Sequence, residues 1–145
     1  MSKSDTTLRK TTIAAIKRRS KKPFEWNITR FYETERPEDI GPIKMELGLQ
    51  GDELPVASSI STHTDWTFVT TRRVIGKTDN VKSAININDV EKWTWGDFKG
   101  YEDQQKTMIT LTTLEGREHK FVIETRNASM VMIYAIRTLL QLSRK

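Results

Sequence analysis

Lysine and arginine side chains near the N-terminus are the strongest candidates for binding chemistry in this chain. Five of them fall within six positions: Lys17, Arg18, Arg19, Lys21 and Lys22. Such a cluster can contact the phosphates of nucleic acid, the headgroups of anionic lipids or an acidic protein surface. A solvated tail that aids solubility is the simpler alternative. Insertion into a membrane is disfavoured, because the neighbouring apolar residues, Leu8, Ile13 and Ile16, are few.

Two tryptophans form the second candidate. Trp93 and Trp95 are separated by one residue in an expected strand, so they should share one face of it. Aromatic rings on a sheet can stack on nucleic-acid bases, but Glu91 and Asp97 would repel phosphate there. We therefore expect the two rings to lie in the core or at a protein-binding edge.

Residue types suited to catalysis or metal binding are present, but their spacing is not suited to either. His63 and Asp65 with Ser59 or Ser61 contain the residue types of a hydrolase triad. Catalysis requires the nucleophile and the base to be in contact within a pocket, so a polar turn is the better interpretation. His119 is too distant in sequence to complete a metal motif with His63. We expect no enzyme, no metal site and no cofactor.

An acidic cluster lies between the basic segment and the strands. It consists of Glu33, Glu35, Glu38 and Asp39. A cation could bind to it, but it lacks the ordered spacing and the glycine of a calcium loop. We expect a solvated loop that pairs with the basic segment.

Composition restricts the class of protein. The chain has 145 residues, of which 36% are hydrophobic and 30% charged, as in one globular domain with an appended segment. It has no cysteine, which excludes disulfides and thiolate metal sites and indicates a reducing compartment. No signal peptide and no apolar stretch of about 20 residues is recognisable. The expected location is the cytoplasm, with a peripheral membrane position as a variant of it.

The net charge of +5 is unevenly distributed. Residues 1–22 contain eight Lys and Arg against Asp5 alone, a net charge of +7. The remaining residues contain 16 Lys and Arg and 18 Asp and Glu, a net charge of −2. Any attraction to an acidic partner must therefore come from the N-terminal segment.

The hydrophobic pattern predicts a mainly β domain between two helices. Ser4 or Asp5 can cap a first helix that reaches about residue 20, and Pro23 stops it. Residues 24–32 suit an extended segment, and residues 38–47 suit a helical turn or two. Period-two alternation then predicts seven strands, at residues 54–61, 65–71, 72–77, 81–87, 90–99, 106–113 and 117–125. Asn127 can cap a closing amphipathic helix, whose polar side includes Arg137, Gln141, Arg144 and Lys145. This order favours an antiparallel meander that closes toward a barrel or sandwich.

Four segments carry a family resemblance. They are residues 51–53 followed by TFVTTRRVIG (67–76), ININDVEKWTW (85–95), LTTLEGREHKF (111–121) and the helix over residues 131–142. Together they resemble bacterial PH-like and GRAM-like domains over residues 51–143. The resemblance implies two nearly orthogonal antiparallel sheets of seven strands, capped by the helix, on a superfold that binds lipids, peptides or proteins. Residues 54–71 contain no Lys or Arg, whereas phosphoinositide-binding PH domains carry a basic cluster there.

These observations combine into one hypothesis. The chain is α+β and mainly β, with a basic N-terminal helical arm and connecting segment (1–50) and a PH-like domain (51–145). Its expected function is that of a non-catalytic adaptor that docks a macromolecular partner, with a protein favoured. The alternative is an anion-binding protein that uses the basic arm on nucleic acid or an anionic membrane surface.

Overall fold

The computed structural model describes residues 4–20, 22, 24–101 and 105–144. Helices α1 (Asp5–Arg19) and α3 (Ser129–Ser143) lie near the two ends of the chain, and the short helix α2 (Lys44–Leu47) precedes the main run of strands. The strands in the described residues are β1 (Thr29–Phe31), β2 (Pro55–Thr62), β3 (Asp65–Thr70), β4 (Arg73–Thr78), β5 (Val81–Asn86), β6 (Val90–Thr94), β7 (Lys106–Thr113) and β8 (Glu118–Glu124). The expected α+β class is confirmed.

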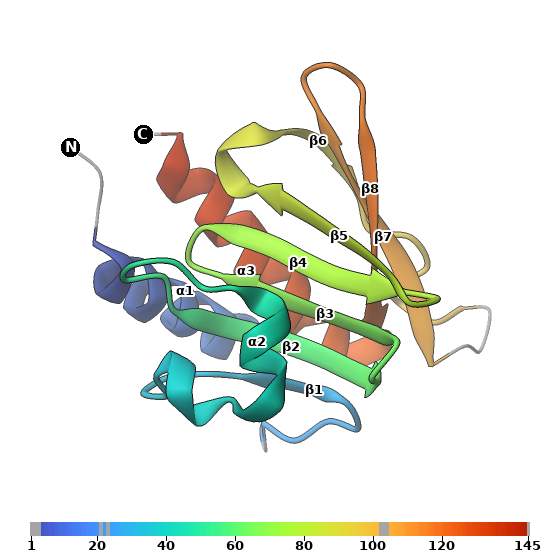
Figure 1. Cartoon of the computed structure of the whole chain (residues 1–145). Helices are drawn as coiled ribbons and strands as arrows, with labels where there is room; N and C mark the ends of the chain where they lie inside the picture. The colour runs from blue at the N-terminus through green and yellow to red at the C-terminus, as the bar shows by residue number, and fades with distance from the viewer. Residues whose placement is uncertain (1–3, 21, 23, 102–104, 145) are drawn as a thin grey trace.

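The strands form two antiparallel sheets. One has the order β1-β2-β3-β4-β5, and the other has the order β6-β7-β8. Figure 1 shows α1 and α3 behind the larger sheet and α2 in front of it. Strand β8 packs against β3 and β4, and the hydroxyl of Thr67 donates to the carbonyl of Val122 at 2.5 Å. No ladder joins the two sheets in the described part of the chain, so of the expected barrel or sandwich the closed barrel is wrong, and the two sheets pack as separate layers.

The seven strands expected after residue 54 are all present, and β1 adds an eighth within residues 24–32. One predicted boundary is clearly wrong: the strand expected over residues 90–99 ends at Thr94. Gly96 has φ +62°, and a Cβ added there would lie 2.4 Å from the carbonyl oxygen of Met108. The backbone therefore turns at a glycine that no other residue can replace without strain. Helix α3 begins at Ser129, and no side chain caps it, so the Asn127 cap is also wrong.

The principal core lies among the two sheets, α1 and α3. Most of the core residues that come from helices belong to α3, at the spacing of one amphipathic face. They are Val131, Met132, Ile133, Ala135, Ile136, Leu139 and Leu140. Ile13 and Ile16 of α1 join the same core, and Ile16 is fully buried. Helix α1 therefore contributes directly to the hydrophobic stability of the fold.

A second core lies on the opposite face of the larger sheet, under the segment that contains α2. It consists of Tyr32, Leu47, Trp66, Phe68 and Ile75. Alternation along β3 directs Trp66 and Phe68 into this core and Val69 into the principal one. Gly76 allows the sheets to approach each other, because an added Cβ would lie 2.9 Å from the ring of Phe121. The central strands of the larger sheet are thus buried on both faces, whereas the edge strand β5 is mostly exposed.

Helix α1 begins where the sequence predicts, because the Ser4 hydroxyl accepts the N–H of Thr7 at 3.2 Å. Its buried face includes polar residues, namely Asp5, Arg9 and Thr12, which weakens the hydrophobic pattern. The segment expected as an arm packs on α3 through α1 and extends the larger sheet through β1. Packing is therefore continuous across residue 50.

Candidate binding groove

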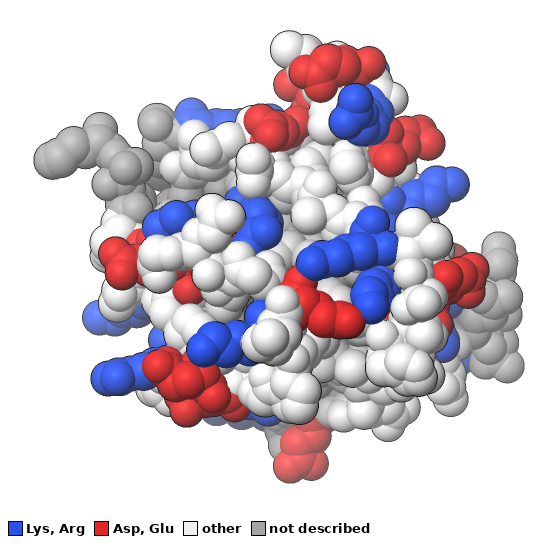
Figure 2. Space-filling model, in the orientation of Figure 1, with Lys and Arg blue, Asp and Glu red and all other residues white. Residues whose placement is uncertain are grey.

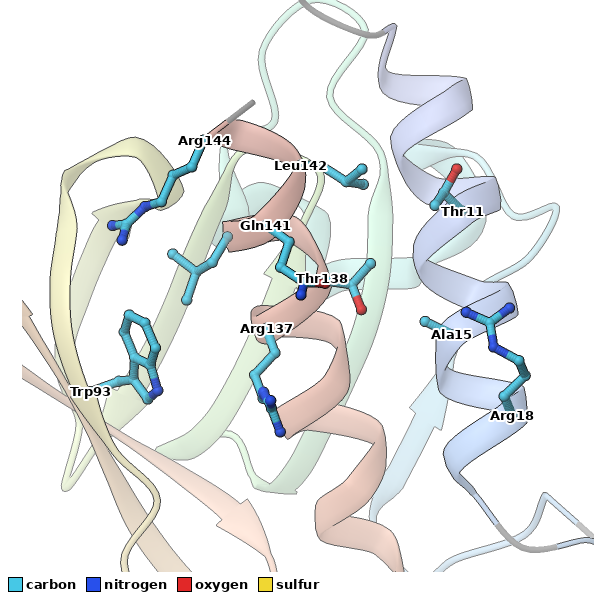
Figure 3. A pocket seen from close by; sticks show the side chains of 10 residues that line it. Thr11, Ala15, Arg18, Trp93, Arg137, Thr138, Gln141, Leu142 and Arg144 are labelled. Carbon is cyan, nitrogen blue, oxygen red and sulfur yellow. The ribbon is translucent and has the colours of Figure 1, made fainter.

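A shallow groove of about 610 Å³ crosses the surface formed by α1, α3 and β6, and we call it the α1–α3–β6 groove. Its lining residues are Thr11, Ala15, Arg18, Trp93, Arg137, Thr138, Leu140, Gln141, Leu142 and Arg144. Figure 3 shows that α1 and α3 run antiparallel, with Trp93 and Arg144 on one side of α3 and Arg18 on the other. The volume is in the range of roughly 300–1,000 Å³ that is common for ligand sites.

Three arginines and no carboxylate line this groove: Arg18 from α1, Arg137 from α3, and Arg144, which directly follows α3. All three are exposed. None of them forms an ion pair with a residue that the structure describes. Arginine retains its charge at any physiological pH. The groove is therefore electropositive and available to an anion.

Apolar side chains from all three elements line the groove together with these arginines. Trp93 keeps 38% of its surface exposed. Leu140 is buried beside it in α3, and Leu142 and Ala15 line the groove where α3 faces α1. An exposed tryptophan beside arginines combines two of the residue types that contribute most of the binding energy in many protein interfaces.

Arginines also stack on aromatic rings at two places around α3. The Arg144 guanidinium lies 5.9 Å from the Trp93 ring centroid and donates to the carbonyl of Val90 at the start of β6. Arg19 and Arg137 lie 5.5 Å and 5.2 Å from the ring of Tyr134. Such contacts orient each guanidinium without neutralising its charge.

The predicted basic residues have different environments. Arg18 lines the groove, and Arg19 lies near it on Tyr134. Lys17 instead pairs with Glu33 at 2.7 Å, which confirms that the acidic cluster contacts the basic segment. Lys22 is exposed, and Lys21 is outside the described residues.

The two tryptophans also differ in environment. Trp93 lines the groove, whereas Trp95 is half-buried against the principal core. We expected both rings either in the core or at a protein-binding edge. The two rings differ: Trp95 packs against the core, and Trp93 lies on the edge strand β6.

Arg137 and Arg144 were not expected as site residues, because they suited the polar side of an amphipathic helix. With Gln141 they follow the spacing i, i+4 and i+7, which places all three on one face. That spacing was a usable signal. The spacing alone, however, does not show that β6 and α1 lie on the two sides of this face.

The residue types of a hydrolase do not assemble. Ser59 is fully buried and bonds the Thr29 hydroxyl, whereas Asp65 accepts the N–H of Asp79 and the hydroxyl of Thr64. The Nδ1 atom of His119 on β8 lies 2.7 Å from the hydroxyl oxygen of Ser83 on β5, and neither residue lines the groove. Among the described residues, no group of three or more His, Asp or Glu could hold a metal ion.

Other carboxylates are used within the fold. The Asp5 carboxylate accepts hydrogen bonds from Arg72, which chiefly lower its pKa, and from Thr71. Burial alone would raise the pKa of Glu53, but hydrogen bonds from Arg73 and Thr70 outweigh burial and lower it. Both carboxylates line a smaller hollow of about 330 Å³ near the start of α1. Because their charges are already paired, this hollow is a poorer candidate site.

The face of the molecule that carries α2 is also less suitable. Figure 2 shows Lys and Arg next to Asp and Glu across this face, and Lys77 pairs with Glu46 at 2.7 Å. Interleaved charges of both signs attract neither kind of ion strongly.

No helix in the described residues is long and apolar enough to span a bilayer. Comparison with known proteins found no matching family model, no matching curated protein and no matching solved structure.

Proposed function

We propose that the protein is a non-catalytic binding module that docks an acidic macromolecular partner, preferably a protein, in the α1–α3–β6 groove. One observation carries the proposal: Arg18 of the basic segment and the exposed Trp93 line a single groove with Arg137 and Arg144, and no carboxylate accompanies them. Arginine forms bidentate hydrogen bonds to carboxylates, and these are stronger than ordinary ones.

A binding role is favoured over catalysis by the chemistry of the lining. The ten lining residues include no His, Cys, Lys, Asp or Glu that could act as a general acid or base. Thr11 and Thr138 are the only hydroxyl groups among them, and a hydroxyl without an adjacent base is a weak nucleophile.

A protein partner is favoured over nucleic acid by the apolar residues that line the groove with the arginines. Trp93 and Leu142 can bury apolar side chains of a partner, whereas a phosphate backbone offers none. The second candidate, an anion-binding protein for nucleic acid or an anionic membrane surface, is supported by the stacking of Arg19 and Arg137 on Tyr134, because such groups also bind phosphates and bases.

The family assignment and the cellular location stay predictions. We continue to propose a PH-like domain for residues 51–143 and a cytoplasmic or membrane-peripheral location. Neither is required for the groove to bind an acidic partner.

Charge reversal tests this function better than deletion does. Removal of residues 1–22 would take Ile13 and Ile16 out of the principal core, so loss of binding could simply reflect unfolding. Arg18→Glu and Arg137→Glu change the groove and leave the core intact. Arg117→Glu, at an exposed turn of the β7–β8 hairpin, is the matched control with the same change of charge.

The full chain and its variants would be titrated with poly-L-glutamate, single-stranded oligothymidylate and phosphatidylcholine–phosphatidylserine vesicles. We expect the two groove variants to weaken binding to poly-L-glutamate at least about tenfold, that is, by about 1.4 kcal/mol. The control should remain close to the unmodified chain. Equal loss in all three variants would contradict the groove as the site. Tight binding to the oligonucleotide, with a steep salt dependence, would favour the second candidate.

A further inference from the structure

We propose that the partner segment binds in an extended conformation, as an additional strand on the free edge of β6 beside α3. This inference rests on the proposed function and names the conformation and chemistry of the occupant. It concerns the part of the α1–α3–β6 groove that lies between Trp93 and α3.

The first observation is that β6 is an edge strand next to the groove. It pairs with β7 on one side, and on the other side no strand among the described residues pairs with it. An edge strand presents unpaired N–H and C=O groups that can bind another chain. Strand addition uses these groups for affinity, and alternate side chains then provide specificity.

The second observation is that a backbone carbonyl of β6 already accepts a hydrogen bond from the C-terminal end of α3. The carbonyl of Val90 accepts from the Arg144 guanidinium, which connects the start of β6 to the last turn of α3. Beyond this contact, Trp93 and the α3 residues line the groove together. Figure 3 shows Arg144 and Trp93 on the same side of α3. An added strand would lie about 4.8 Å from β6, in the groove.

The third observation is the spacing of the arginines that would face such a strand. Arg137 and Arg144 are seven residues apart, about 10 Å along the helix axis. Residues i and i+4 of an extended chain share a face and are about 13 Å apart. Two flexible arginine side chains can bridge the difference between this distance and their own separation along the helix. The residue between them, i+2, would lie on the exposed part of Trp93.

The predicted recognition pattern is therefore acidic-x-apolar-x-acidic. The two acidic side chains would pair with Arg137 and Arg144, and the apolar side chain would cover the exposed part of Trp93. A helical ligand would instead show apolar residues at i, i+3 and i+4, so the two conformations predict different sequences.

Selection of a display library of random peptides on the full chain tests this inference. We expect the enriched peptides to share the alternating pattern, and Arg137→Glu to weaken them at least tenfold while Arg117→Glu does not. Two N-methylated versions of the best peptide would then be made, one for each phase of the strand: the first is methylated at the even-numbered residues and the second at the odd-numbered residues. Only one phase should weaken binding at least tenfold, because only alternate N–H groups of an added strand face β6.

Amide hydrogen exchange provides a second readout. We expect the bound peptide to slow exchange in residues 90–94 and to leave β5, the edge of the other sheet, unchanged. Enriched peptides that depend on Arg137 but tolerate both phases of N-methylation, or that follow the helical pattern, would overturn the extended mode and leave the proposed function intact. If no peptide is enriched, or if binding ignores Arg137, both the mode and the proposed protein-docking function fail.

Discussion

The two ends of α1 use their charges differently. At the N-terminal end, Asp5 accepts hydrogen bonds from Arg72 at 2.9 and 3.1 Å, and the Arg9 guanidinium donates to the carbonyls of Glu35 and Pro55. At the C-terminal end, Lys17 forms an exposed pair with Glu33, but Arg18 and Arg19 form no ion pair with any described residue. One helix therefore contains charges used in folding and charges available for binding.

The same difference separates the arginines of the whole domain. Arg73 forms two hydrogen bonds to the buried carboxylate of Glu53, at 3.0 and 2.8 Å. In the groove, Arg137 and Arg144 contact aromatic rings instead, and Arg144 also donates to a backbone carbonyl. A charge that is paired in the fold stabilises it when its partner is present, whereas an unpaired surface charge contributes little to stability and can act on a partner.

The largest effect is expected at Glu53, which is 1% exposed. Glu53→Ala leaves the Arg73 guanidinium, whose side chain is 20% exposed, without its carboxylate. Removal of one member of a buried pair costs about 3–5 kcal/mol. Urea unfolding should show this loss, while Glu115→Ala in the exposed hairpin turn should be nearly neutral. A loss below about 1 kcal/mol would show that this ion pair is not important for folding.

The next effect is the pH dependence of the Asp5 contact. Because the pKa of Asp5 is lowered in the folded state, its contribution is present above the unfolded pKa of about 4 and is lost as the pH falls below that value. Asp5→Asn should reduce the free energy of unfolding by about 2 kcal/mol at neutral pH. Urea titrations at several pH values should show the difference shrink below about pH 4; a pH-independent difference would contradict a charge effect.

A smaller effect is expected for the Lys17–Glu33 pair, whose side chains are 39% and 47% exposed. Exposed pairs contribute about 0–1 kcal/mol, and salt weakens them. A double-mutant cycle with Lys17→Ala and Glu33→Ala should therefore give a coupling free energy below about 1 kcal/mol. A larger, salt-resistant coupling would mean that this pair belongs with the folding charges.

The smallest effect on stability is expected in the groove. Arg137→Ala should change the free energy of unfolding by no more than about 0.5 kcal/mol, because Arg137 is exposed and forms no ion pair with the described residues. The same variant should weaken binding of acidic polypeptide. Substantial destabilisation by Arg137→Ala would end the distinction between folding and binding arginines.

Much of the fold was predictable because it depends on local patterns. Period-two alternation identified β2 to β8, and turn residues such as Gly116 marked their separations. The end of β6 was missed, because Trp95 and Phe98 continue the aromatic pattern from a loop and pack on the core from there. The role of α1 was also underestimated: its buried Asp5 is paired with Arg72, which is distant in sequence.

The candidate site was predictable only in pieces. Arg18 and Trp93 were singled out separately, and Arg137 and Arg144 were assigned to the polar side of a helix. Each residue type was visible in the sequence, but no local signal connects positions 18, 93 and 137.

The amino-acid sequence by itself determined the order of strands and helices, the basic N-terminal segment and the absence of cysteine, since these depend on composition and on neighbours a few residues apart. Only the tertiary structure decided which charges are paired and which remain available. Pairing depends on the distance between side chains, and the packing of α1 against α3 and of the sheets against each other sets that distance. The same packing brings an edge strand, a tryptophan and three arginines together in one groove.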